Sequence, residues 1–196
     1  MDIIGNQKIW TFTEGAESTT GLSTSAIRKG SAHLVRNYVD LATKVAELQF
    51  RNRDFVLMFR GQSGDHKNRL GYTSLKPSLL RSAKSGRVPT DATLNERFER
   101  LVRAEAALVA EYKARGLIGR ERLERQRILR WAMIQHYEIC PTPLLDVTQS
   151  LRIAASFATH NANGEAYVFV LGIPNVSGAI TASAEAGIQT VRLASV

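Results

Sequence analysis

The chain has 196 residues, 44% of them hydrophobic, which suits one domain with its own core. Its 26 lysines and arginines outnumber 18 acidic residues, and the net charge of +8 favours anionic partners such as nucleic acid, a nucleotide or an acidic protein. The single cysteine, Cys140, excludes an intrachain disulfide, and no segment approaches the roughly 20 apolar residues that span a bilayer. We therefore expect a cytoplasmic protein without membrane contact.

Residues 1–53 are predicted to form an N-terminal extension and a helix. The short apolar segment from Ile9 to Phe12 precedes a stretch rich in serine, threonine and glycine that is typical of a loop. A helix is predicted over 31–50, because apolar residues recur there three and four positions apart. These residues are Leu34, Tyr38, Leu41, Val45 and Leu48.

The next segment, DFVLMFR at 54–60, is a continuous apolar run that predicts a buried strand. The strand ends on Arg60, directly before Gly61. A guanidinium is costly to desolvate unless a carboxylate or phosphate meets its donors, which favours an anion site. An arginine that reaches back to water is an equally good interpretation. The polar connection over 61–91 is longer than most and is typical of a functional loop or a disordered one, and we favour the functional interpretation.

Two helices are predicted over about 92–137, where alanine, leucine, glutamate and arginine dominate. The first ends at Gly116, and the second runs from about Gly119 through Tyr137. Much of the basic excess lies in 114–133, which also fits an amphipathic helix with a solvated basic face. We favour that interpretation over a nucleic-acid groove.

The segment LLDVT at 144–148 predicts a short strand in which Asp146 and Thr148 share one face. Both are polar residues in an apolar context, which raises the prospect of a functional role. Asp146 has structural alternatives, because it could anchor a turn or neutralise a buried arginine such as Arg60 or Arg81.

A helix is predicted to follow, with Ser150 as its N-cap and Asn163-Gly164 at its end. The residues expected to face inward are Ile153, Ala154 and Phe157. The β-branched and aromatic run at 165–174 is the clearest strand of the chain, and a further strand is predicted within 187–196.

Several kinds of site are poorly supported. The four histidines are scattered and the cysteine stands alone, so we expect no metal site. Residues 61–71 match neither the P-loop nor the dinucleotide-binding glycine pattern, and no serine lies in a nucleophile elbow. His136 could simply satisfy the last carbonyls of its helix. The histidines are His33, His66, His136 and His160.

A set of spaced motifs nevertheless resembles the FRG domain, which is named for its Phe-Arg-Gly motif. They are FRGQ at 59–62, LKPSLLR at 75–81, QHYE at 135–138, PTPLLDVT at 141–148 and the A..FA pattern at 154–158. The usual family pattern has a glycine near Glu138, an arginine at Pro143 and an aromatic residue at Val147. The resemblance covers roughly 54–196, a domain that we expect to be truncated at its C-terminal end.

The resemblance implies an α+β fold with an ADP-ribosyltransferase-like split β-sheet core, an N-terminal helix and a helical insertion at about 92–137. It implies an NAD-dependent ADP-ribosyltransferase-like toxin or anti-phage defence effector, or an NAD glycohydrolase. The acceptor would be nucleic acid or protein, and an antitoxin or regulatory partner would fit such a role. The alternative is a non-catalytic module that binds a nucleotide or nucleic acid.

The same resemblance assigns roles to individual residues. Arg60 would grip the diphosphate or ribose of NAD, Thr148 with Ser150 would order the nicotinamide ribose, and His136 with Tyr137 would hold ribose hydroxyls and stack on nicotinamide. Asp146 is the alternative candidate for the carboxylate beside the anomeric carbon. The implied catalytic residues are Arg60, His136, Asp146 and Thr148. The implied cofactor-binding residues are Arg60, Gly61, Gln62, Ser78, Arg81, His136, Tyr137, Thr148, Ser150 and Phe157.

One part of the implied site is missing. The resemblance calls for a glutamate or glutamine after the last strand, and Glu185 and Gln189 lie too early for it. We expect that residue to lie beyond residue 196.

Overall fold

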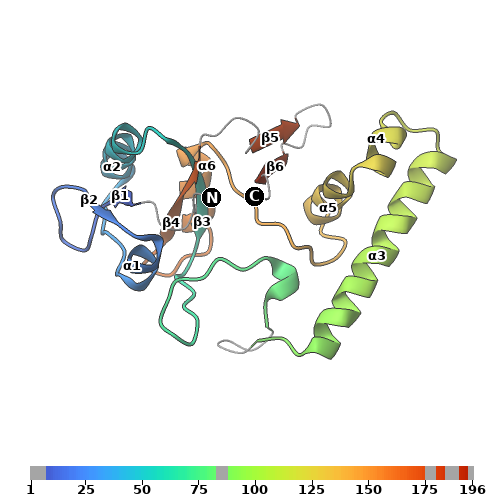
Figure 1. Ribbon diagram of the computed structural model, residues 1–196, viewed down its shortest axis with the longest axis horizontal. Helices are drawn as coiled ribbons and strands as arrows, with labels where there is room; N and C mark the ends of the chain where they lie inside the picture. Colours follow the sequence, from blue (N-terminus) through green and yellow to red (C-terminus); the bar gives the residue numbers. More distant parts are fainter. Residues whose placement is uncertain (1–7, 83–87, 175–179, 184–189, 194–196) are drawn as a thin grey trace. The chain divides into compact units, whose positions relative to one another are not determined.

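The computed structural model describes residues 8–82, 88–174, 180–183 and 190–193 (Figure 1). The chain divides into two compact units. The first unit contains residues 1–74 and 146–176, and the second contains residues 75–145 and 177–196. The described residues mix helices with small antiparallel sheets, which confirms the α+β class. The ADP-ribosyltransferase-like core stays a prediction.

The first unit is built around one antiparallel strand pair. Its elements are β1 (Ile9–Thr11), β2 (Thr20–Leu22), α1 (Thr24–Lys29), α2 (Tyr38–Arg51), β3 (Phe55–Gln62), α6 (Leu151–Thr159) and β4 (Tyr167–Pro174). β3 pairs with β4 along its whole length, from Phe55 opposite Pro174 to Gln62 opposite Tyr167. Both strands were predicted.

Helices α2 and α6 cover one face of the β3–β4 pair. Leu57 and Phe59 are buried there against Val45 of α2 and Ala154 of α6. Of the predicted apolar stripe, Leu41, Val45 and Leu48 pack in this core, whereas Tyr38 is 47% exposed. The other face of the sheet carries the alternate residues of both strands.

Gly61 brings the backbones of β3 and α6 into direct contact. A Cβ atom at Gly61 would lie 1.9 Å from the Ala154 carbonyl oxygen and 2.5 Å from the Ala158 nitrogen. Only glycine permits so close an approach. Because Ala154 and Ala158 form this contact, the larger Ile153 and Phe157 turn away from the sheet. Their predicted inward packing is wrong, since 45% of Ile153 and 68% of Phe157 is exposed.

The boundaries of two predicted helices need correction. The Asn37 side chain accepts a hydrogen bond of 2.9 Å from Asp40 N, so α2 begins at Tyr38 and not at residue 31. Leu34 therefore lies outside the helix and is 75% exposed. Helix α6 has the predicted N-cap at Ser150 but ends at Thr159, before the predicted stop. β2 and α1 occupy part of the segment predicted as loop.

The predicted strand at 144–148 is reduced to one bridge. Phe59 N donates to Thr148 O at 2.7 Å, and Thr148 N donates to Phe59 O at 2.8 Å. The chain passes from the second unit to the first between Leu145 and Asp146, so only the end of this segment runs beside β3. Asp146 and Thr148 therefore do not share the face of a regular strand.

The second unit is mainly helical. Its elements are the 3-10 helix η2 (Ser78–Leu80), α3 (Asp91–Ala114), α4 (Arg120–Arg125), α5 (Arg127–His136), β5 (Ile180–Ser183) and β6 (Thr190–Leu193). Figure 1 shows α4 and α5 beside the long helix α3. The second predicted helix is broken at Gln126, whose backbone is extended. Only residues 190–193 of the predicted strand at 187–196 are described, and they form β6.

The core of the second unit joins the helices to the PSLLR motif. Leu79, Leu101, Ile134 and Cys140 pack together in it. Burial raises the pKa of the Cys140 thiol, as expected for a small apolar residue of the core. Within the described ranges, no helix is long and apolar enough to cross a membrane.

Candidate functional site

The structure brings Arg60 to Asp146 in the first unit, and it pairs Thr148 with Phe59, the residue before Arg60. Arg60 Nη1 donates to the carbonyl oxygen of Asp146 at 2.5 Å. The neighbouring Phe59 forms the bridge to Thr148. The backbone of Asp146 thus orients the Arg60 guanidinium. Asp146 and Thr148, two of the predicted catalytic residues, belong to the same short segment. Asp146 is exposed, and Arg60 and Thr148 are half-buried.

The face of the sheet that carries Arg60 also carries an aromatic pair. Directly opposite residues of antiparallel strands share a face. Arg60 lies opposite Phe169, and Gln62 lies opposite Tyr167. The rings of Tyr167 and Phe169 stack with centroids 6.5 Å apart and planes 21° apart. Sequence reasoning missed these two aromatic residues, although their spacing in YVFV already placed them on one face.

The turn after β3 holds a further polar group around Asp65. Its Oδ2 atom accepts from Thr73 Oγ1 at 3.0 Å and lies 3.9 Å from Lys67 Nζ. The Oδ1 atom of Asp65 and the Oε1 atom of Gln62 are both buried, and neither has a hydrogen-bond partner among the described residues. Asp65 was not among the predicted site residues.

The hydroxyl groups of Thr148 and Ser150 shape the entry into α6. Thr148 Oγ1 accepts from Ser150 N at 3.0 Å, and Ser150 Oγ accepts from Ile153 N at 3.4 Å. Both contacts are of the capping type that starts a helix. The predicted contacts of these residues with a ribose stay predictions, as does the predicted ligand contact of Phe157.

In the second unit, three of the spaced motifs meet at the buried Thr142. Ser78 Oγ donates to Thr142 O at 3.4 Å and accepts from Thr142 N at 3.2 Å. The Thr142 hydroxyl bonds Gln135 Oε1. Ser78, predicted to bind the cofactor, therefore ties η2 to the PTP segment. Its role in binding stays a prediction.

Arg81 closes the PSLLR motif at the surface. Arg81 Nε donates to Lys76 O at 2.8 Å. From α3, Arg97 Nη1 donates to Leu79 O at 2.7 Å and to Arg81 O at 2.6 Å, which fixes the backbone around the motif. The predicted contact of Arg81 with an anion stays a prediction.

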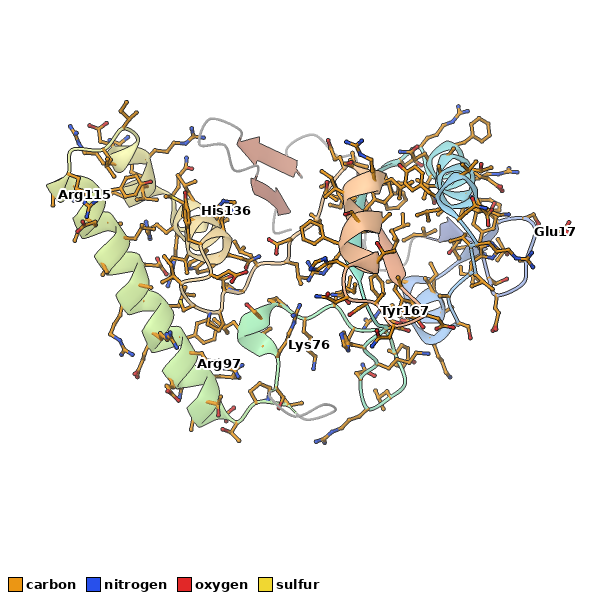
Figure 2. The ribbon with its side chains drawn as sticks, turned by 180° about the vertical axis from the view of Figure 1, so that it is seen from behind. Glu17, Lys76, Arg97, Arg115, His136 and Tyr167 are labelled. Carbon is orange, nitrogen blue, oxygen red and sulfur yellow. The ribbon has the colours of Figure 1, made fainter. Side chains whose placement is uncertain are left out.

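His136 is the exposed last residue of α5 (Figure 2). The exposed Tyr137 follows it as the C-cap. Their rings meet edge to face with centroids 5.0 Å apart. Glu138 follows with φ 52°, while Glu138 N donates to Gln135 O and Ile139 N donates to Ile134 O, both at 3.0 Å. This is a helix end with a left-handed residue after the cap, the position at which glycine is preferred.

We predict that Glu138→Gly stabilises the protein by about 0.5–1 kcal/mol. A left-handed conformation is costly for a residue with a Cβ atom, whereas glycine adopts it freely at some cost in chain entropy. Glu138→Ala removes the same charge but keeps the Cβ atom, so it should give no comparable gain. Urea unfolding of the two variants measures the difference, and equal midpoints would contradict this account.

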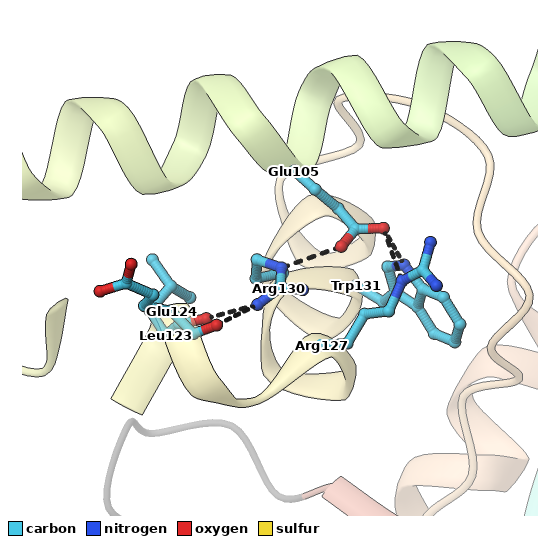
Figure 3. Close-up of polar contacts among 6 residues, drawn as sticks. All are labelled: Glu105, Leu123, Glu124, Arg127, Arg130 and Trp131. Carbon is cyan, nitrogen blue, oxygen red and sulfur yellow. Dashed lines mark hydrogen bonds and ion pairs between the residues drawn. The ribbon is translucent and has the colours of Figure 1, made fainter. Parts of the chain in front are cut away.

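A buried carboxylate holds the helices of the second unit together (Figure 3). Glu105 Oε1 accepts from Trp131 Nε1 at 2.7 Å and from Arg127 Nε at 3.1 Å, and Oε2 accepts from Arg130 Nε at 2.9 Å. Arg130 also donates to the carbonyl oxygens of Leu123 and Glu124. The predicted solvated basic face is thus partly wrong, because the Arg130 side chain is only 15% exposed.

Comparison with known proteins identifies one family. The family model described as FRG domain matches residues 56–166, more than half of the chain. The match spans β3 except for its first residue, the helices α3 to α6 and all the motifs named above. No curated protein and no solved structure matches the chain. In the described part of the chain, no group of three His, Cys, Asp or Glu residues could hold a metal ion.

Proposed function

The chain belongs to the FRG domain family, and from this membership we propose that it is an ADP-ribosyltransferase-like effector that uses NAD as substrate. The observation that supports the proposal most is the position of Arg60. Its guanidinium is oriented by the Asp146 carbonyl, one residue from the bridge that joins β3 to Thr148. An oriented guanidinium suits the diphosphate of a dinucleotide, because its planar donors match phosphate oxygens.

The reaction breaks the bond between nicotinamide and ribose. Nicotinamide leaves with the bonding electron pair, and positive charge develops on the ribose. An acceptor hydroxyl or amine, or water in the glycohydrolase reaction, then bonds to the anomeric carbon and loses a proton. Arg60 binds the diphosphate, and the exposed Asp146 carboxylate supplies negative charge for the developing cation.

The acceptor is nucleic acid or protein, and the biological role is that of a toxin or an anti-phage effector. The net charge of +8 supports an anionic acceptor. The contacts of His136 and Tyr137 with a ribose and with nicotinamide, implied by the family resemblance, stay predictions.

We predict that Arg60→Ala weakens NAD binding about 10- to 100-fold, since a hydrogen bond to a charged group contributes about 1.5–3 kcal/mol. Arg60→Lys keeps the charge but loses the planar fork, and should recover only part of the affinity. Isothermal titration with NAD measures both variants. The exposed Arg69 is the matched control, and Arg69→Ala should bind like the parent protein.

Release of nicotinamide, followed with DNA, RNA or protein present as acceptor, separates an enzyme from a binding module. Release that depends on Arg60 supports the enzyme. Binding that depends on Arg60 without release identifies the non-catalytic nucleotide-binding module. NAD affinity that is unchanged in Arg60→Ala would overturn the proposal.

A further inference from the structure

Two acceptor atoms without donors lie at the end of β3. Gln62 Oε1 and Asp65 Oδ1 are buried, and neither has a hydrogen-bond partner in the described part of the chain. Burying a polar atom without a partner is costly, so such atoms are uncommon in folded proteins and call for an explanation. Both atoms are oxygens. The group that would satisfy them must therefore be a donor.

The two oxygens lie next to the aromatic pair of β4. Gln62 is directly opposite Tyr167 in the register. Tyr167 Oη donates to Glu165 Oε2 at 3.0 Å, and the Glu165 carboxylate raises the pKa of that phenol. Asp65 follows Gln62 by three residues, in the turn that leaves this end of β3. Gln62, Asp65 and Tyr167 therefore form one group at this end of the sheet.

The same face continues to Arg60, two residues before Gln62. Residues two apart on a strand are separated by about 7 Å on one face. Along this face, an oriented guanidinium is followed by acceptor oxygens beside the stacked rings of Tyr167 and Phe169. A nucleotide is recognised by hydrogen-bond donors for its phosphate, by a planar apolar surface for its base and by acceptors for the N–H groups of that base.

We infer that Gln62 and Asp65 form a subsite for the amino group of a planar base, with Gln62 Oε1 and Asp65 Oδ1 each accepting an N–H. This deepens the proposed function and rests on it, because it assigns one end of NAD to a defined place. Two parts of NAD carry this chemistry, the carboxamide of nicotinamide and the exocyclic amine of adenine. Analogues with an oxygen in place of the amino group should bind more weakly, since their oxygen would face the acceptor oxygens of Gln62 and Asp65.

The probes are two matched pairs of compounds, titrated into the full chain. Nicotinamide and nicotinic acid differ in the carboxamide, and AMP and IMP differ in the exocyclic amine. We expect the amino member of one pair to bind at least tenfold more tightly than its partner. The pair that shows this difference identifies which end of NAD occupies the subsite. Equal affinity within both pairs, or no binding of any of the four, would overturn the inference.

Gln62→Leu is the decisive variant. It removes the acceptor but keeps the size of the side chain, and it removes a buried oxygen without a partner, so the fold should not lose stability. The discrimination within the selected pair should fall at least tenfold. Gln62→Glu keeps an acceptor and should retain the discrimination, as should the control Ser63→Ala at an exposed position.

Failure of this inference and failure of the proposed function give different results. If NAD binds through Arg60 and Gln62→Leu changes neither the affinity nor the discrimination, the subsite is refuted and the proposed function stands. If NAD does not bind but one pair shows a difference that Gln62→Leu abolishes, the subsite stands and the proposed function is refuted.

Discussion

Gly61→Ala is expected to destabilise the first unit by about 3 kcal/mol, at the upper end of the range for overpacked cores. The new methyl group would lie 1.9 Å from the Ala154 carbonyl oxygen and 2.5 Å from the Ala158 nitrogen. Both are backbone atoms of α6, so no change of rotamer relieves the clash. The helix as a whole must move off β3, and it takes with it the contact of Ala154 with Phe59.

Gly64→Ala is the matched control, three residues further along the chain. A Cβ atom there meets only His66 Cε1 at 4.0 Å, so the variant should unfold like the parent protein. Urea unfolding followed by circular dichroism compares the two. A Gly61→Ala midpoint equal to that of Gly64→Ala would show that α6 does not approach the strand this closely.

The residues of the Phe-Arg-Gly motif thus lie on both faces of β3. Phe59 and Gly61 face α6, where Phe59 is buried in the core and Gly61 admits the helix. Arg60 faces the opposite side with Gln62 and the aromatic residues of β4. A variant at Gly61 should lower activity through loss of fold, whereas Arg60→Ala, which loses the hydrogen bond to the Asp146 carbonyl but causes no backbone clash, should lower the unfolding midpoint much less. Measuring both the activity and the unfolding midpoint of the two variants therefore separates the role of Gly61 from that of Arg60.

Local patterns in the sequence predicted the elements that depend on local chemistry. The apolar runs that became β3 and β4, the long helix α3 and the N-cap at Ser150 follow from propensity and capping. The inward face of α6 could not be predicted in this way. Ala154 packs inward and Phe157 does not, because a glycine about ninety residues away requires small neighbours.

Which residues lie together in the candidate site depends on the register of β3 and β4. Hydrophobic patterns alone do not specify that register. Arg60 was predicted from its place at the end of an apolar run. The aromatic residues opposite it follow only from the pairing of Gln62 with Tyr167, which joins segments more than a hundred residues apart. Likewise, nothing local to α3 marks Glu105 as the partner of arginines on α5.

Glu105→Ala should destabilise the second unit by about 3 kcal/mol, the lower end of the range for removing one partner of a buried ion pair. The truncation leaves Trp131 Nε1 without its acceptor at 2.7 Å and the largely buried Arg130 without its counter-ion. Two features limit the loss. Arg130 keeps its two backbone acceptors, and the Arg127 side chain is 54% exposed and can turn to water.

Glu99→Ala is the control for Glu105→Ala, because its pair with Arg103 on the same helix is largely exposed. Such pairs contribute little, so the free energy of unfolding should hardly change. Equal effects of the two substitutions would show that the Glu105 network does not hold α5 to α3.

The ionisation of Glu105 makes the contribution of this network dependent on pH. Burial opposes the charged form, but hydrogen bonds from Trp131, Arg130 and Arg127 outweigh it, so the pKa of Glu105 falls below its ordinary value of 4.5. A lowered pKa stabilises the fold at pH above 4.5, and that stability is lost as the pH falls through the pKa of the folded state. Glu105→Gln cannot ionise. Its stability should therefore fall less steeply below pH 4.5 than that of the parent protein, and parallel curves would mean that another carboxylate drives acid unfolding.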